Sequence, residues 1–474
     1  AKAGLVSGSA LLVDYVLTIA ISVASGGDAL FSLFPAEYHH WKVPFVCLGI
    51  AFMTVVNLRG VRESVLMWAP VFFAFLATHA VAILVAIGIH LAEFGEVADR
   101  TRSQIELAHA EIGLGGIAVL LLRAFSVGAG TYTGIEAVSN GLPVLREPQV
   151  ETGKRTMTLM GLSLGITVFG LLMAYMLVNV QPVEGKTLNA VLFESITATW
   201  SAGLGGAFVL VSLLSATALL FIAAQAGFLD GPRVLANMAQ DRWFPSRFAT
   251  LSDRFVAQNG ILLMGVAALA VVIATDGSVG TLVILYSINV FLTFSLSQLG
   301  MCVHWVKNRG AGWKRGLAIN GLGLAVTASI LVALCTIKFF EGGWITLVAT
   351  AAVVLLAVYV KRHYTRSFRR IRRLDDALAP IERGEIPTVT LPEPGTGRTA
   401  IVLCNGYNGL GVRTFFSIFR MFPRTFDRCV FVHIGAVDAG TFKGAAEIDR
   451  LRETTAEQAA KFVALAQRCG VKAD

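Results

Sequence analysis

Ten apolar runs of about bilayer length constrain what this chain can fold into. A helix needs about 20 mostly apolar residues to cross the hydrocarbon core of a membrane. Only 15% of the 474 residues are charged and 55% are hydrophobic, which is far from the composition of soluble domains. The expected spans lie near residues 5–33, 42–58, 66–92, 114–142, 156–180, 205–229, 260–275, 281–304, 316–340 and 343–360. The sequence therefore predicts an all-α polytopic membrane protein in the lipid bilayer.

Basic residues predict which ends of these spans face the cytosol. Loops rich in Lys and Arg alternate with loops that hold few, and cytoplasmic loops carry the excess. The loops with few basic residues are therefore expected on the outer side of the membrane, and their basic residues are Lys42, Arg100, Arg102, Lys186 and Lys338. The alternation places both ends of the chain in the cytosol and explains the net charge of +8 without a nucleic-acid partner. We expect a multi-pass protein of the cell (inner/plasma) membrane.

The composition changes after the last span. A dense basic segment from Lys361 to Asp376 is expected at the anionic inner leaflet, and a Pro- and Gly-rich linker follows it. From Thr399 the pattern alternates strand and amphipathic helix, which predicts a parallel α/β layer. The predicted parts are a transmembrane transporter domain at 1–362, a flank and linker at 363–397 and a partial cytosolic regulatory domain at 398–474. Because the chain starts without Met and the sheet is short, we expect a fragment.

A glycine-rich turn follows the first strand of this layer, where such folds place ligands. It reads CNGYNGLG and offers Asn405, Gly406, Asn408 and Gly409 as weak candidates for cofactor binding. It has neither a GxGxxG fingerprint nor a P-loop lysine. A tight turn without a ligand explains these residues equally well.

The predicted fourth span is interrupted by polar residues in a costly place. The stretch AFSVGAGTYTGIEAVSNGLP contains glycines, hydroxyls and the carboxylate of Glu136. A broken helix is tolerated at membrane depth only where it lines protein or a wet cavity. Thr133 lies three residues before Glu136 and shares its helical face. We interpret this stretch as half of a substrate site.

A second candidate lies in the first run, where Tyr15, Thr18 and Ser22 place three hydroxyls on one helical face. A dehydrated monovalent cation requires several oxygens to replace its water shell, and a ladder of hydroxyls supplies them. Alternatively, Thr18 and Ser22 bond to their own backbone carbonyls and Tyr15 packs between helices. Asp14 either faces the ion or makes a cap or an ion pair.

Glu136 favours the first interpretation, since an ionisable group inside a membrane is costly and is by default functional. We hypothesise that its carboxylate exchanges a proton as a cation arrives or leaves, with Asp14 as a second candidate for proton coupling. Arg123 in the same span should either snorkel to the outer surface or pair with an acid. The histidines and serines form no HExxH or GxSxG motif, so an enzyme is not expected.

Four motifs resemble the amino acid–polyamine–organocation superfamily, and closely its KimA-type potassium transporter branch. They are GSALLVDYVLT, GTYTGIEAVSNGLP, GFLDGPRVLANMAQDRWFP and NGYNGLGVRTFFSIFRMFP. The resemblance implies a LeuT-like inverted repeat, with ten of twelve spans present here, followed by a truncated domain similar to universal stress proteins. It also implies a homodimer through that domain and cyclic di-AMP as a suggested regulator.

The same resemblance implies potassium:proton symport with potassium and a proton as the transported species and no cofactor. Its potassium ligands carry over to Tyr15, Thr18, Ser22, Thr133, Glu136 and Tyr286. The family draws further ligands from its first span, which this sequence does not contain. Two other functions stay open: an amino acid or polyamine permease on the same scaffold, and a membrane ion sensor or scaffold without transport.

Overall fold

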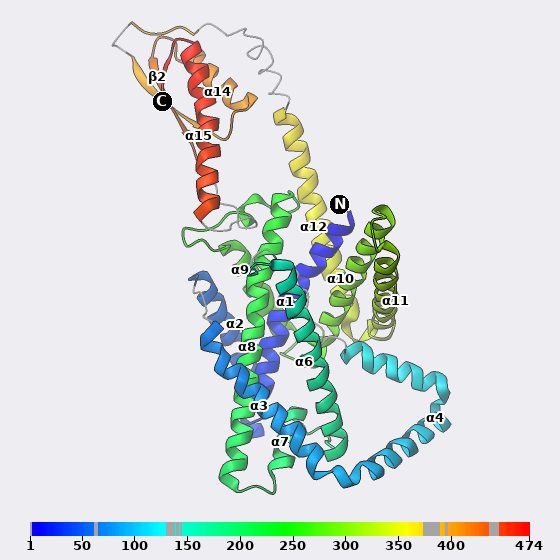
Figure 1. Cartoon of the computed structure of the whole chain (residues 1–474). Coiled ribbons are helices and arrows are strands. Elements are labelled where there is room, and N and C mark those ends of the chain that lie inside the picture. The colour runs from blue at the N-terminus through cyan, green and yellow to red at the C-terminus, as the bar shows by residue number, and fades with distance from the viewer. Residues whose placement is uncertain are drawn as a thin grey trace. The chain divides into compact units, whose positions relative to one another are not determined.

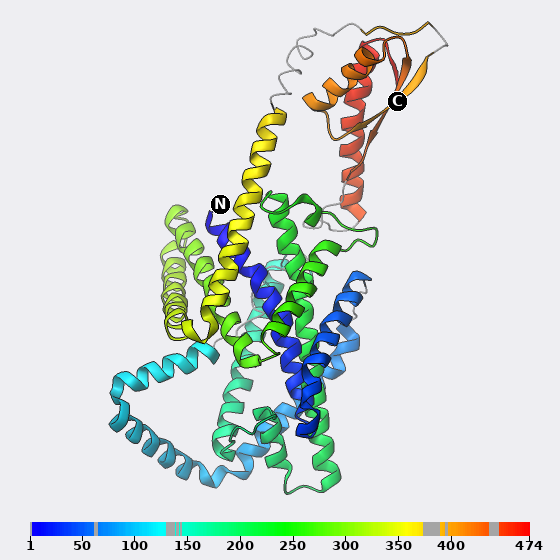
Figure 2. The same cartoon turned by 180° about the vertical axis from the view of Figure 1, so that it is seen from behind.

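The protein is described by a computed structural model at residues 2–60, 65–128, 138, 142, 145–372, 389–393, 397–435 and 445–474. Its chain divides into two compact units (Figures 1 and 2). The first comprises Ala1–Leu235 and Asp253–Leu355, and the second comprises Ala236–Ser252 and Leu356–Asp474.

Helices form the described part of the first unit, and two of them, α8 and α12, continue into the second. In chain order they are α1 (Lys2–Phe31), η1 (Ala36–Trp41), α2 (Lys42–Leu58), α3 (Val65–Ile89), η2 (Leu91–Glu93), α4 (Phe94–Gly128), α6 (Gln149–Val178), α7 (Leu188–Thr197), α8 (Ala202–Gln240), α9 (Gln258–Ala274), α10 (Val279–Lys307), α11 (Trp313–Ile337), the π-helical turn η6 (Phe339–Gly343) and α12 (Trp344–Arg372).

Nine helices within the described ranges are long and apolar enough to cross a membrane. This confirms a mostly helical polytopic membrane protein, with nine candidate spans among the described residues where ten spans were expected for the chain. The tenth expected span, 260–275, corresponds to α9, which has 17 residues. The helix α2 also has 17 residues, but it continues from η1, so its candidate span runs from Ala36 to Leu58.

The helix α4 differs most from its expected span at 114–142. It begins at Phe94 and continues across a kink at Gly113, whose φ of 66° is left-handed. Its most apolar 18-residue window has no buried residue, and in both views α4 extends away from the other helices and turns midway (Figures 1 and 2). The first half of α4 is too rich in charged residues for the membrane interior, so its apolar part lies in the second half.

The helix α1 lies at the centre of the packing and contacts α2, α9 and α10. It also approaches α8, where Thr217 Oγ1 donates to the Gly26 carbonyl at 3.2 Å. A separate apolar cluster joins α3, α6, α7 and α8 around Phe193 and Leu213. Another apolar cluster joins α10 and α11 around Ile288 and Leu334. Residues far apart in sequence therefore meet along α1.

The C-terminal part of the second unit is a parallel three-stranded sheet with strand order β1-β2-β3. Its elements are β1 (Arg398–Cys404), α14 (Gly409–Met421), β2 (Phe426–His433), α15 (Ala445–Arg468) and β3 (Lys472–Ala473). Phe431 of β2 stacks on Phe462 of α15 at 5.2 Å and lies 5.9 Å from Phe415 of α14. The alternation of strand and helix expected from the sequence is confirmed as a small parallel α/β region.

The C-terminal ends of α8 and α12 also belong to the second unit, with the short helix η5 (Ser246–Phe248) between α8 and α9. Lys361 of α12 donates to the carbonyl of Asp241. The Arg242 guanidinium lies 3.7 Å from the centre of the Phe368 ring. The predicted basic flank thus begins as a continuation of the last helix, held by the loop after α8.

Candidate functional site

The three hydroxyl residues predicted on α1 differ in their surroundings. Tyr15 is 2% exposed and Ser22 is 8% exposed, whereas Thr18 is partly accessible. Thr18 Oγ1 donates to the Asp14 carbonyl at 2.9 Å, which is the local bond expected for a polar residue in a membrane helix. A hydroxyl that donates its proton still has oxygen lone pairs for a cation. The bond is therefore compatible with both interpretations of this residue.

Close packing against α8 fixes this part of α1. Gly227 and Gly231 of α8 face α1, and a Cβ at Gly231 would lie 3.3 Å from the Tyr15 Cβ. Small residues four apart let two membrane helices approach closely. The sequence motif GFLDG therefore positions the predicted site residues from a second helix, which the sequence analysis did not foresee. Its GxxxG spacing was the signal that could have revealed it.

Tyr286 lies on α10, which packs directly against α1, and is 4% exposed. One turn later on α10, Asn289 accepts a hydrogen bond at 2.9 Å from Thr350 of α12. Thr346 of α12 donates to the Leu285 carbonyl at 3.1 Å. Polar groups near Tyr286 thus connect α10 to α12. Tyr286 itself lies on α10, the neighbour of α1, whose residues Tyr15, Thr18 and Ser22 form the predicted hydroxyl ladder.

The two predicted ligands of the interrupted span, Thr133 and Glu136, lie outside the described residues, so their place in the site stays a prediction. The described helix α4 reaches Gly128. Near its end, Arg123 Nη2 pairs with Glu341 Oε1 of η6 at 2.9 Å. This confirms pairing with an acid for Arg123. Asp14 is 1% exposed, and its role in proton coupling also stays a prediction.

The glycine-rich turn of the C-terminal region uses its polar groups locally. Asn408 caps α14, and its Oδ1 accepts from the Gly411 amide at 2.9 Å while its Nδ2 donates to the Asn405 carbonyl at 3.0 Å. The positive φ of Gly406 is the left-handed turn that glycine favours. These bonds account for Asn408 without a ligand. Cofactor binding at Asn405, Gly406, Asn408 and Gly409 stays untested.

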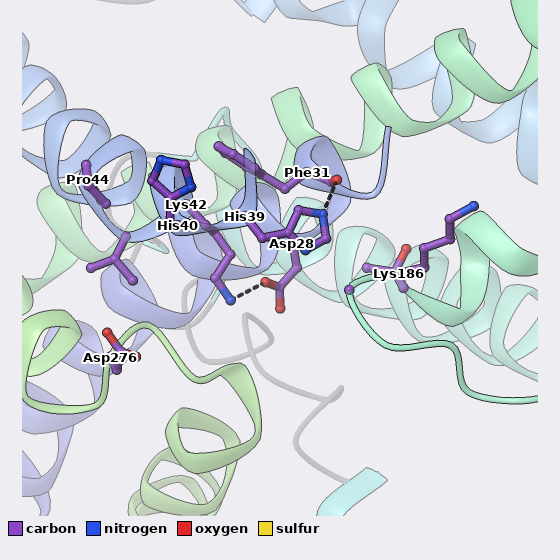
Figure 3. A pocket seen from close by; sticks show the side chains of 11 residues that line it. Asp28, Phe31, His39, His40, Lys42, Pro44, Lys186 and Asp276 are labelled. Atoms are coloured by element: carbon purple, nitrogen blue, oxygen red, sulfur yellow. Dashed lines mark hydrogen bonds and ion pairs between the residues drawn. The ribbon is translucent and has the colours of Figure 1, made fainter. Parts of the chain in front are cut away.

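A cavity of about 750 Å³ lies at the end of α1 that the charge pattern places outside. Figure 3 shows Asp28 of α1 joined to Lys42 at the start of α2, with Asp276 on a separate loop. The Asp28 Oδ1 to Lys42 Nζ distance is 2.8 Å. This cavity was not predicted from the sequence because three loops build it, although Asp28 at the end of an apolar run was a visible signal.

Loops around the cavity are held by hydrogen bonds. His39 Nε2 lies 3.1 Å from the Phe31 carbonyl (Figure 3), and the Thr187 amide donates to Ser32 Oγ at 3.0 Å. A Cβ at Gly185 would clash with the His39 ring, and the positive φ of that glycine also excludes most other residues. The cavity is therefore a built feature of this end of the helices.

Comparison with known proteins fits this arrangement. A family described as amino acid permease matches residues 1–359. The chain is 32% identical over 401 residues to the potassium transporter KimA of Bacillus subtilis (strain 168), an alignment that covers 85% of this chain and 63% of that protein. The chain thus spans less than two thirds of that relative. The matched family consists of transporters, which confirms that the chain is not an enzyme. Its long match over the helical region shows that this chain belongs to the amino acid permease (APC) family of plasma-membrane transporters.

Proposed function

We propose that this chain is part of a secondary active potassium importer, a potassium:proton symporter that works by alternating access in a LeuT-like inverted repeat. The observation that carries the proposal is the hydroxyl ladder on α1. Thr18 is partly accessible beside the buried Tyr15 and Ser22, and α10 brings Tyr286 onto a neighbouring helix. Neutral oxygens at membrane depth suit a dehydrated monovalent cation. The similarity to a potassium transporter supports the same choice of ion.

Proton coupling is assigned to Glu136, with Asp14 as the second candidate. A carboxyl at membrane depth resists ionisation, while an adjacent cation favours it. For symport the proton must travel inward with potassium and leave on the cytosolic side, where the adjacent cation favours its release, so the two ions move in linked steps. Regulation by cyclic di-AMP, a homodimer through the C-terminal region and the likeness of that region to universal stress proteins depend on the resemblance alone and stay predictions.

The direct test is rubidium-86 uptake by potassium-transport-deficient cells that express the full-length protein. Thr18→Val keeps the shape of the side chain and removes the oxygen, so we expect uptake to fall about tenfold or more, because one lost ligand of a desolvated ion costs more than 1.4 kcal/mol. Thr327→Val is the matched control, since Thr327 of α11 makes the same kind of bond to the Gly323 carbonyl at 2.9 Å. Equal uptake by both variants would refute the site.

An amino acid or polyamine permease is the second candidate, and the match to the amino acid permease family favours it. In such a protein the broken helix would bind the carboxylate of a substrate at its helix ends. Competition separates the two: excess potassium should displace rubidium, whereas amino acids should not. A protein that binds an ion without moving it, as a sensor would, should show binding without uptake.

A further inference from the structure

One narrow stripe of α1 is accessible along its outer half. From Leu17 to Ala29 every residue is buried except four: Thr18, Ile21, Ser25 and Asp28. Their spacing of three, four and three residues places them on one helical face. Three of the four carry a side-chain oxygen. The stripe rises about 15 Å from the predicted potassium site at Thr18 to the outer cavity at Asp28.

The cavity presents Asp28 to a cation. Lys42 Nζ lies 2.8 Å from its Oδ1, and the two side chains are 30% and 25% exposed for Asp28 and Lys42 respectively. Lys186, the other lysine of the cavity, is engaged at 2.7 Å by both carboxylate oxygens of Glu194. The lining carries two carboxylates, Asp28 and Asp276, and two lysines, of which Lys186 is held by Glu194 outside the lining (Figure 3).

The ammonium of Lys42 lies against one oxygen of the Asp28 carboxylate. It is a compact, strongly hydrated monovalent cation on a flexible four-carbon stem. A partly exposed ion pair of this kind contributes only about 0–1 kcal/mol, so separating the two side chains costs little. Ser25 and then Thr18 offer the next oxygens along the accessible stripe.

We infer that Asp28 is an outer capture site for a monovalent alkali cation, that Lys42 competes for it as a tethered cation, and that Ser25 lies on the route from this site to Thr18. This inference rests on the proposed potassium transport. It adds the place where the ion first binds and a residue that tunes its affinity.

The two partners of the ion pair should have opposite effects on uptake by the full-length protein. Asp28→Asn removes the capturing charge, so the half-saturating rubidium concentration should rise about two- to fivefold. Lys42→Gln removes the competitor, so that concentration should fall by a similar factor. Lys186→Gln, in the neighbouring pair, is the matched control and should change it little. A merely structural pair would instead give the same impairment in Asp28→Asn and Lys42→Gln, which would overturn the inference.

A second measurement does not depend on transport. Ser25→Cys is labelled with a small cationic thiol reagent, and the signal of the protein without this substitution is subtracted because six native thiols are present. Potassium should slow labelling of the introduced thiol, and Asp28→Asn should abolish that protection. Protection without rubidium uptake would refute potassium transport while supporting the capture site. Absence of labelling, or labelling that potassium does not affect, would overturn the capture site itself. As a folding control, each variant should migrate normally on size exclusion.

Discussion

Gly227 of α8 lies directly against the backbone of Tyr15 in α1. A Cβ built on Gly227 would be 2.7 Å from the Tyr15 carbonyl oxygen and 2.6 Å from Ile19 Cγ1. Real Cβ atoms do not approach a backbone oxygen so closely, and a carbonyl inside a helix cannot move aside. Two helices therefore meet where the predicted potassium ligands lie, and the contact leaves no room for a methyl group.

Gly227→Ala should consequently destabilise the protein and shift the hydroxyl ladder. Overpacking of a tight contact costs about 1–3 kcal/mol, so we expect a lower melting temperature in detergent and reduced rubidium uptake. Gly206→Ala is the control within the same helix, because a Cβ at Gly206 meets nothing within 4 Å. If the two variants melt and transport alike, the close contact does not support the site.

A reciprocal amide pair joins α2 to α8. Asn57 Nδ2 donates to Gln225 Oε1 at 2.8 Å, and Gln225 Nε2 donates to Asn57 Oδ1 at 3.3 Å. Hydrogen bonds between membrane helices contribute about 1 kcal/mol. Asn57→Leu should lower the unfolding free energy by about that amount or more, because it leaves the Gln225 amide unpaired. The double variant with Gln225→Leu should recover part of the loss in SDS unfolding, and purely additive losses would contradict the pairing.

The carboxylate of Glu341 lies between two cations from different segments. It accepts from Arg123 of α4 at 2.9 Å and from Lys338 at 2.5 Å, and Lys338 is 8% exposed. Glu341→Gln leaves a buried ammonium without its counter-ion, whereas Arg123→Gln leaves the Lys338 pair intact. Melting temperatures in detergent should therefore fall further for Glu341→Gln, and Lys338→Met added to it should restore stability. The reverse order of the single variants would contradict this arrangement.

Burial protects the thiols of the C-terminal region. It raises the pKa of Cys429 from its usual 9.0 to about 11 and also raises the pKa of Cys404. The reactive thiolate is then about one part in a thousand of Cys429 at pH 8. Iodoacetamide should modify Cys429 slowly in the folded protein and rapidly after unfolding, as measured by peptide mass spectrometry.

The same shift predicts a pH window for stability. Because the pKa of Cys429 is higher in the folded state, its contribution is fully present below pH 9 and is lost as pH rises toward 11. A Cys429→Ala variant, although less stable overall, should show a weaker loss across that window. Rapid alkylation of native Cys429 at pH 8 would contradict the burial of this strand.

Sequence reasoning worked where a pattern repeats along one element. Apolar runs of bilayer length became α1, α2, α3, α6, α8, α10, α11 and α12, and the alternation after Thr399 became β1, α14, β2 and α15. Each depends on a local period that the backbone imposes. Likewise, the cost of an unpaired charge in lipid gave pairing with an acid as one of two expectations for Arg123, the other being snorkelling to the surface.

Features that depend on tertiary contact were not predicted. The cavity at Asp28 needs η1, the start of α2 and two separate loops, and no single segment contains it. The helix α4 begins at Phe94, ahead of the expected span, and continues across a kink at Gly113. The hydrogen bond from Thr18 to its own helix backbone was expected as an alternative to ion binding. The observed bond does not decide between the two, because the hydroxyl donates its proton to the Asp14 carbonyl while its oxygen lone pairs stay available to a cation.

The central claim is proton-coupled potassium transport through the ladder on α1, and the most direct test uses the purified full-length protein in proteoliposomes. An imposed proton gradient should drive rubidium-86 uptake by the unaltered protein, Glu136→Gln should abolish the dependence on the gradient, and Thr18→Val should abolish most uptake. Gradient-driven uptake that both substitutions leave intact, or amino acid uptake in place of rubidium, would contradict it.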